Sequence, residues 1–185
     1  MNIVTTKRFT IDEYHRLIEL GFLQENERIE LIQIVAKRTA HTVCGSILCR
    51  QHRLLGDRAV IRGQYPITLP NQSEPEPDVA IARGIDEDIL LVIEISDTTL
   101  DYDQTTKLEI YAEAGISHYW IVNLNARQLE HYNQPYQNAQ GKFNYLSKQI
   151  SLPCQSVAIP GFEDVFLELN RIFPPVVSES GLTQK

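Results

Sequence analysis

The sequence is poor in cysteine, tryptophan and methionine, and it has no long apolar segment. Its three cysteines, Cys44, Cys49 and Cys154, show no CxxC spacing, and an odd number does not suit a disulfide framework. No apolar run approaches the roughly 20 residues that a membrane-spanning helix needs. Residues 1–8 lack the apolar core and the small-residue cleavage site of a signal peptide. These absences predict a cytoplasmic protein with reduced thiols.

The length of the chain is that of one domain. A chain of 185 residues is long enough to bury a substantial core, and no repeat or low-complexity segment divides it. We therefore expect a single domain over residues 1–172. The polar residues 173–185 are expected to form a flexible tail.

The net charge of −7 argues against a nucleic-acid partner, but the charges are unevenly distributed. Between Lys37 and Arg62 there are six basic residues and one acid, whereas Glu74 to Glu113 contains twelve acids. A basic flank beside an acidic centre suits a metal site that a polyanion approaches. A solvated helix face beside acidic loops explains the same pattern. The charge pattern thus permits nucleic acid without demonstrating it.

The hydrophobic periodicity predicts an α/β (α+β) protein, a central mixed β-sheet flanked by helices. Helices are expected over residues 10–21, 39–56, 101–114 and 162–170. Strands are expected over residues 28–32, 59–69, 77–83, 89–96, 118–124, 127–133 and 142–148.

The strand predicted over residues 89–96 (ILLVIEIS) is a nearly continuous apolar run that contains a carboxylate, Glu94. A lone buried carboxylate costs on the order of several kcal/mol unless a positive group meets it. Asp78 opens the preceding strand, and Lys107 lies in the first turns of the following helix. Two acids on adjacent strands and a nearby lysine are the components of a divalent-metal phosphodiester hydrolase. A buried Glu94–Lys107 salt bridge, with Asp78 as a strand-start or turn residue, is the alternative.

Four segments, in this order, resemble the Uma2 family of the PD-(D/E)XK nuclease superfamily. They are EPEPDV at 74–79, LVIEISDTT at 91–99, YDQTTKLEIYAEAGI at 102–116 and YWIV at 119–122. The resemblance extends from about Thr10 to Leu169. It implies a restriction-endonuclease-like core that binds DNA and cleaves it with Mg²⁺, for which Mn²⁺ could substitute. Dimerisation is common among such nucleases, because a two-fold pair can cut both strands, so the resemblance allows a homodimer that no sequence feature shows.

The resemblance also implies a set of site residues. Asp78 and Glu94 match the two acids of the family, and Lys107 matches a lysine on the following helix. The usual lysine position of the superfamily, two residues after the second acid, is Ser96 here. Mg²⁺ prefers oxygen ligands, which Asp78, Glu94 and the backbone carbonyl of Ile95 could supply. Lys107 would orient the attacking water, which the metal activates, or stabilise charge on the phosphate.

Four further residues, Glu30, His41, Ser96 and Asp103, are candidates for accessory roles. Asp103 is expected to favour the helix N-terminus through the dipole, or to hold Lys107 by an i,i+4 pair. Glu30 matches an acid on an early strand and would assist metal binding through water, unless it only faces solvent. His41 matches a histidine at the start of the second helix and would contact phosphate or transfer a proton, unless it is structural. The other histidines show no ligand spacing, so zinc is not expected.

The connections at 33–38 and 83–88 are shorter than those of the family and put substrate affinity and activity in question. One alternative is therefore a catalytically weak or inactive nucleic-acid-binding module that keeps the nuclease fold. Another is a structural or regulatory domain whose acids only form ion pairs.

Overall fold

A computed structural model of the chain describes residues 11–22, 44–84 and 88–173. The helices are α1 (Ile11–Glu19), α2 (Cys44–Leu55), α3 (Leu100–Tyr102) and α4 (Leu108–Glu113), and a π-helical segment, η2 (Asp103–Lys107), joins the last two. Short 3-10 helices lie at Gly56–Arg58 and Leu169–Arg171. The strands are β1 (Val60–Arg62), β2 (Val79–Arg83), β3 (Asp88–Ser96), β4 (His118–Asn123), β5 (Gln128–Gln137), β6 (Phe143–Ser151), β7 (Ser156–Ile159) and β8 (Phe162–Glu168).

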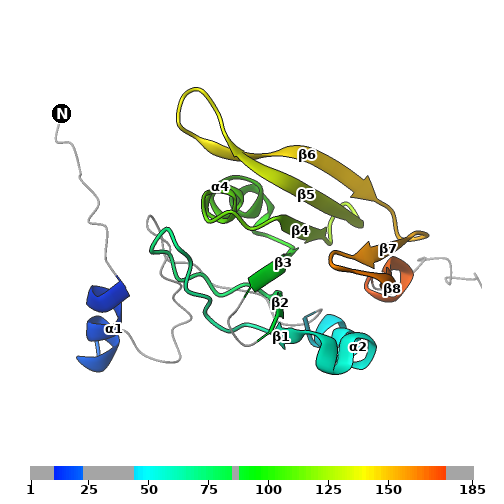
Figure 1. Cartoon of the computed structure of the whole chain (residues 1–185), viewed down its shortest axis with the longest axis horizontal. Coiled ribbons are helices and arrows are strands. Elements are labelled where there is room, and N and C mark those ends of the chain that lie inside the picture. The colour runs from blue at the N-terminus through cyan, green and yellow to red at the C-terminus, as the bar shows by residue number, and fades with distance from the viewer. Residues whose placement is uncertain (1–10, 23–43, 85–87, 174–185) are drawn as a thin grey trace, which may run out of the picture.

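The first six strands form one mixed sheet in the order of the sequence, β1-β2-β3-β4-β5-β6 (Figure 1). Only β3 and β4 pair in parallel; the other neighbours in this sheet are antiparallel. A parallel pair needs a crossover connection, and the α3–η2–α4 segment supplies it. Strands β7 and β8 form a separate hairpin. The predicted mixed sheet with flanking helices is thus confirmed.

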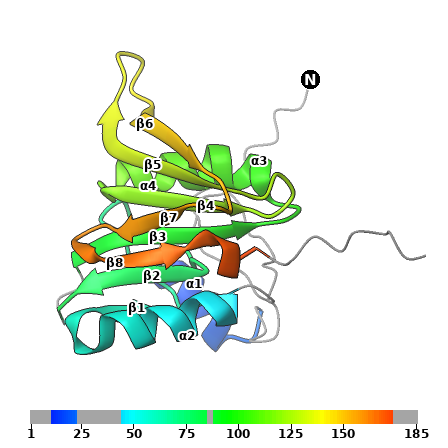
Figure 2. The ribbon, with the colours of Figure 1, turned by 90° about the vertical axis from the view of Figure 1, so that its right-hand side faces the viewer.

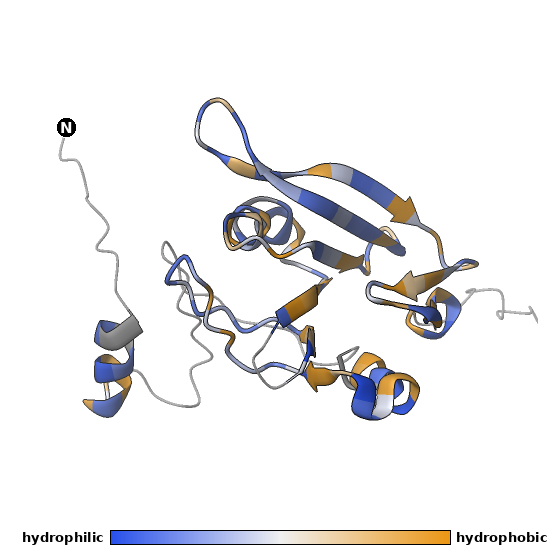
Figure 3. Cartoon of the chain, in the orientation of Figure 1, coloured by the Kyte–Doolittle hydropathy of each residue, from blue (hydrophilic) through white to orange (hydrophobic). Residues whose placement is uncertain are grey.

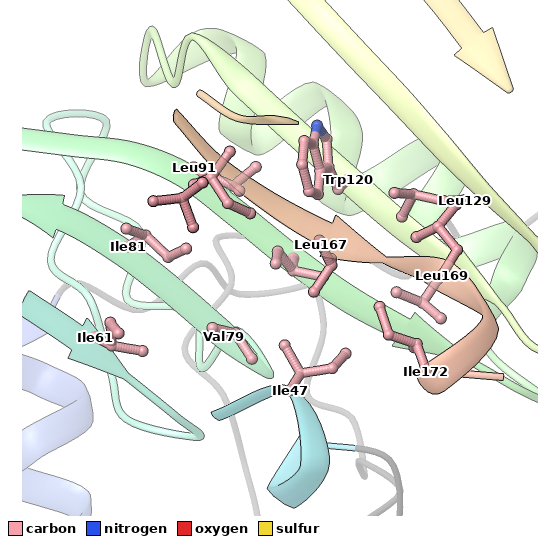
Figure 4. Close-up of a cluster of buried hydrophobic side chains, with 14 of the residues drawn as sticks. Ile47, Ile61, Val79, Ile81, Leu91, Trp120, Leu129, Leu167, Leu169 and Ile172 are labelled. Atoms are coloured by element: carbon pink, nitrogen blue, oxygen red, sulfur yellow. The ribbon is translucent and has the colours of Figure 1, made fainter. Parts of the chain in front are cut away.

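Two apolar layers lie on opposite faces of the sheet. The β7–β8 hairpin and α2 cover one face, and the α3–η2–α4 crossover covers the other (Figure 2). Figure 4 shows the first layer, which contains Ile47 of α2, Leu91 of β3 and Leu167 of β8. The second layer gathers Val92, Tyr111 and others under the crossover.

Strand β3 contributes to both layers, because successive side chains of a strand point to opposite faces. Leu91 and Ile93 belong to the layer under α2 and β8, and Val92 belongs to the layer under the crossover. Figure 3 shows β3 as an apolar strand, whereas the β5–β6 hairpin is mainly hydrophilic. By the same alternation, Glu94 and Ser96 face the crossover, and this places the candidate site between the crossover and the sheet.

The structure corrects two predicted elements. The helix predicted over residues 162–170 is wrong: the segment forms β8 and then a 3-10 turn. Burial alternates between Val165 and Leu169, with Phe166 exposed, which is the period of a strand with one buried face.

The strand predicted over 59–69 is limited to Val60–Arg62. Beyond it, the chain forms a loop that folds back on itself, in which Ile67 N–H donates to the Pro75 carbonyl at 3.0 Å. Pro66 has no N–H to donate, so a regular ladder cannot continue through it. The strand predicted over 28–32 lies outside the described residues.

The helices in the described part of the chain are too short or too polar to cross a membrane.

Stability is expected to fall in mild acid because of His131 on β5. Its Nε2 lies 3.0 Å from Ser151 Oγ, and its ring packs edge-on against Trp120. Burial lowers the pKa of His131 to about 4, against about 6.5 in an unfolded chain. The unfolded state therefore binds more protons between these two values, so the contribution is complete above pH 6.5 and is lost as the pH falls toward 4. After allowance for solvent screening, we expect a loss of about 1–2 kcal/mol.

Urea unfolding of wild type and His131→Gln between pH 7 and 4 measures this contribution. The variant should lose less stability over the interval than wild type does. Gln140→Ala, which changes an exposed residue of the β5–β6 turn that does not titrate, is the control and should follow wild type. Equal losses in wild type and His131→Gln would contradict the assignment.

Candidate active site

The pairing of β2 with β3 brings the two predicted acids together. Val79 pairs with Ile93, so Asp78, the residue before Val79, lies beside Glu94 and Ile95 of the neighbouring strand. The backbone N–H of Ile95 donates to Asp78 Oδ2 at 2.8 Å. Gln64 Nε2 makes a longer contact of 3.5 Å with Asp78 Oδ1. Asp78 and Glu94 are each only 1% exposed, so both carboxyls are buried.

The crossover brings the predicted lysine to the same place. Lys107 is the last residue of η2, and its Nζ lies 2.9 Å from Glu94 Oε1. The hydroxyl of Tyr111, one helical turn further on, donates to the same oxygen at 2.7 Å. Lys107 is 2% exposed, and Tyr111 is fully buried. The structure therefore assembles Asp78, Glu94 and Lys107, and it adds Tyr111, which the sequence analysis missed.

Ser96 and Asp103 contact each other beside these residues. Asp103 Oδ2 accepts hydrogen bonds of 2.5 Å from Ser96 Oγ and from Thr99 Oγ1. In the described part of the chain this carboxylate binds the two hydroxyls, and the predicted i,i+4 pair with Lys107 is not formed. Ser96, at the usual lysine position of the superfamily, thus anchors the start of η2 to the end of β3.

The site carries an excess of buried negative charge. Among the described residues, the three carboxyls of Asp78, Glu94 and Asp103 accompany the single ammonium of Lys107. Burial raises the pKa of Asp78; the Ile95 N–H and the charge of Lys107 oppose that rise, and the charge of Asp103 adds to it. Burial, followed by the charges of Glu94 and Asp103, raises the pKa of Tyr119 well above its ordinary value. A cation bound among these carboxyls would offset their repulsion.

The donor set fits a hard divalent cation only in part. Carboxylate oxygens are the ligands that Mg²⁺ prefers, and Mg²⁺ commonly uses one or two carboxylates and several waters. Over residues 11–22, 44–84 and 88–173, no group of three His, Cys, Asp or Glu side chains is arranged to hold a metal ion. Asp78 and Glu94 would therefore need water or phosphate oxygens to complete a coordination shell.

A further buried acid, Glu130 on β5, was also missed by the sequence analysis. It is 1% exposed. Its Oε2 accepts from Gln104 Nε2 and Tyr132 OH, each at 2.8 Å, and from Lys148 Nζ at 2.7 Å. Its Oε1 accepts from Asn123 Nδ2 at 3.2 Å and Gln128 Nε2 at 3.1 Å. Burial opposes ionisation of Glu130, but the hydrogen bonds from Lys148, Tyr132, Gln104 and Gln128 outweigh it and lower its pKa to about 2.

Several predicted features lie outside the described residues. These are Glu30, His41, the connection at 33–38 and residues 85–87 of the connection at 83–88. Their roles stay predictions, as does the metal-binding role of the Ile95 carbonyl.

Comparisons with known proteins define first the fold and then the family. The crystal structure of "a putative nuclease belonging to DUF820" from Anabaena variabilis ATCC 29413 superposes on this structure with a TM-score of 0.63. The two sequences are 13% identical, and the superposition covers 89% of this chain and 97% of the Anabaena chain. The chain therefore has the fold of that protein. The sequence model of the Uma2 family, described as "Putative restriction endonuclease", matches residues 11–168. The chain belongs to the Uma2 family. Among curated proteins, no sequence matches it.

Proposed function

We propose that this protein is a divalent-metal-dependent endonuclease that hydrolyses phosphodiester bonds of DNA. The observation that carries the proposal is the burial of Asp78, Glu94 and Lys107 at one place: Asp78, just before β2, lies beside Glu94 of β3, and Lys107 of the crossover contacts Glu94. Membership of the Uma2 family supports a nuclease. A homodimer would present two such sites to the two strands of a duplex.

Asp78 and Glu94, with the Ile95 carbonyl, would hold Mg²⁺, and Mn²⁺ could replace it. Bound there, the cation would acidify a water molecule and neutralise charge on the phosphate. Lys107, fixed by Glu94, has ammonium protons to donate to the attacking water or to a phosphate oxygen. Tyr111 holds the Glu94 carboxylate in place from the other side. Hydrolysis adds the water oxygen to phosphorus and breaks one ester bond, and the leaving oxygen takes up a proton.

Burial strengthens these interactions. Charges in a region of low dielectric constant interact several-fold more strongly than charges in water. Because the lysine and the carboxylates are already fixed by hydrogen bonds, little reorganisation would be needed when charge develops on the phosphate.

The second candidate function is a nucleic-acid-binding module with weak or no catalysis. Two observations favour it. Glu94 Oε1 already accepts hydrogen bonds from Lys107 and Tyr111, which leaves this oxygen less available to a metal ion. In the described part of the chain, no three His, Cys, Asp or Glu side chains are arranged to hold a metal ion. Such a module would bind DNA with a strong salt dependence and would not turn it over.

The test is a calorimetric titration of Mg²⁺ and of Mn²⁺ into wild type and Asp78→Asn at near-physiological salt. We expect wild type to bind the ion and Asp78→Asn to lose most of the binding, because the neutral amide is a poor ligand for a hard cation. Asp88→Asn is the matched control, since Asp88 is exposed at the opposite end of β3.

A second titration includes a DNA duplex with uncleavable linkages, whose phosphates can complete the coordination shell. Binding that appears only with DNA still supports the proposal if Asp78→Asn abolishes it. Lack of metal binding in both titrations would refute the metal-dependent mechanism. DNA binding without metal binding or turnover would then support the second candidate.

A further inference from the structure

We infer that Glu130 is a positioning residue: through Gln104 it fixes the π-helical segment η2 and so holds Lys107 against Glu94. The positional part of the inference concerns this chain alone. Its catalytic consequence rests on the proposed function.

Glu130 lies in the same row of the sheet as the candidate site. Ile121 of β4 pairs with Glu94 on β3 and with Glu130 on β5. Residues paired across neighbouring strands lie on the same face, so both carboxylates lie beneath the crossover. Two strand spacings, about 10 Å, separate them. Glu130 is thus too far from the candidate site to contact the reacting atoms, but it is close enough to support η2, the segment that carries Lys107.

The hydrogen bonds of Glu130 connect the sheet to the crossover at one point. Four of its donors belong to the sheet: Asn123 of β4, Gln128 and Tyr132 of β5, and Lys148 of β6. The fifth, Gln104, belongs to η2. Because the sheet donors fix the carboxylate, Gln104 meets an acceptor that cannot move with the helix. Burying a carboxylate costs free energy unless hydrogen bonds and a countercharge compensate it. The hydrogen bond from Gln104 is one of the contacts that compensate the burial of Glu130.

Segment η2 needs such an anchor. A π-helical turn is rare and less favourable than an α-helical one, and it occurs frequently at functional sites. The segment is held at Asp103 by Ser96 and Thr99, and at Gln104 by Glu130. Lys107 follows Gln104 by three residues and ends the segment. If the Gln104 anchor is lost, η2 can relax toward an α-helix, which would shift Lys107 relative to Glu94.

The experiment compares Gln104→Ala, Glu130→Gln, their double variant and the control Gln128→Ala. Gln128 donates to the same carboxylate but belongs to the same strand as Glu130, so its hydrogen bond does not reach the crossover. The first readout is the side-chain NMR signal of Lys107. The chain has six lysines, and the signal that Lys107→Met removes is that of Lys107. The second readout is Mg²⁺-dependent cleavage of duplex DNA.

We expect Gln104→Ala and Glu130→Gln to move the Lys107 signal and to lower kcat by roughly tenfold to a hundredfold with little change in KM. The double variant should be no worse than the poorer single variant, because Gln104→Ala removes a hydrogen bond that Glu130→Gln already weakens. Gln128→Ala should leave the Lys107 signal and kcat within twofold of wild type.

A Lys107 signal that stays at its wild-type position in Gln104→Ala would overturn the inference, and so would an equal displacement in Gln128→Ala. The NMR readout does not need catalysis. If wild type cleaves no DNA, the proposed function fails while the Lys107 signal still decides whether Glu130 positions the lysine. If wild type cleaves DNA and Gln104→Ala cleaves it equally well, the inference fails and the proposed function stands.

Discussion

Asp78→Asn is expected to reduce Mg²⁺-dependent DNA cleavage by roughly a thousandfold or more. The amide keeps the size of the carboxyl and can still accept the Ile95 N–H, so the pairing of β2 with β3 should be preserved. It removes the charge that would attract the cation. Cleavage of a labelled duplex under single-turnover conditions gives the rate without a contribution from product release.

The same variant should not lose stability when metal is absent. Burial raises the pKa of Asp78, so the ionised carboxyl is unfavourable where it lies, and replacing it with a neutral group removes that cost. We expect the Tm of Asp78→Asn to equal or exceed that of wild type, as is typical of residues kept for function. Asp88→Asn should retain both rate and Tm. A cleavage rate within tenfold of wild type in Asp78→Asn would contradict the assignment.

Lys107→Met is expected to reduce the free energy of unfolding by about 3–5 kcal/mol. The substitution keeps much of the apolar volume of the side chain but removes the ammonium from Glu94, which is 1% exposed. The buried carboxylate then retains the Tyr111 hydroxyl and loses its countercharge. Equilibrium unfolding in urea, followed by circular dichroism, measures the difference.

The double variant Glu94→Gln/Lys107→Met separates loss of charge pairing from loss of packing. It should recover a large part of the lost stability, because the Glu94 carboxylate that Lys107 compensated is removed as well, but it should not recover cleavage. Lys142→Met, which removes an exposed lysine of the β5–β6 turn, should leave stability within about 0.5 kcal/mol of wild type. A Lys107→Met variant as stable as this control would show that the pair with Glu94 contributes little.

The central part of the candidate site was predictable because its residues break local rules. Glu94 interrupts an apolar strand, and a charged residue in such a run demands a partner. Asp78 and Lys107 lie on the elements immediately before and after that strand, where short connections keep neighbours in sequence close in space. The structure places Asp78 beside Glu94 on the neighbouring strand and brings Lys107 into contact with Glu94.

Tyr111 and Glu130 were not predictable in the same way, because each obeys the local pattern. Tyr111 occupies an inward position of an amphipathic helix, where an aromatic residue indicates core packing. Glu130 lies between Leu129 and His131 in a largely polar strand, where a carboxylate would be expected to face solvent. Its burial depends on side chains of η2 and β6, which only the tertiary fold brings near.

The elements that were predicted wrongly failed for related reasons. The segment 162–170 contains apolar residues at spacings that suit a helix, but pairing with β7 fixes it as a strand. The π-helical character of η2 was likewise hidden, because single π-helical turns occur inside α-helices and residues 103–107 fit the helix predicted over 101–114. In both cases long-range packing outweighed local preference.

The candidate site is encoded in one short stretch of the sequence, because the parallel strands β3 and β4 follow one another in the chain. Because β3 and β4 are joined by the α3–η2–α4 crossover, the carboxylates, the lysine and the supporting tyrosine are all encoded between residues 78 and 111. Among the described residues, the segments before β1 and after β6 supply none of these groups. Substitutions in β7 and β8 can therefore accumulate while the proposed reactive groups stay unchanged.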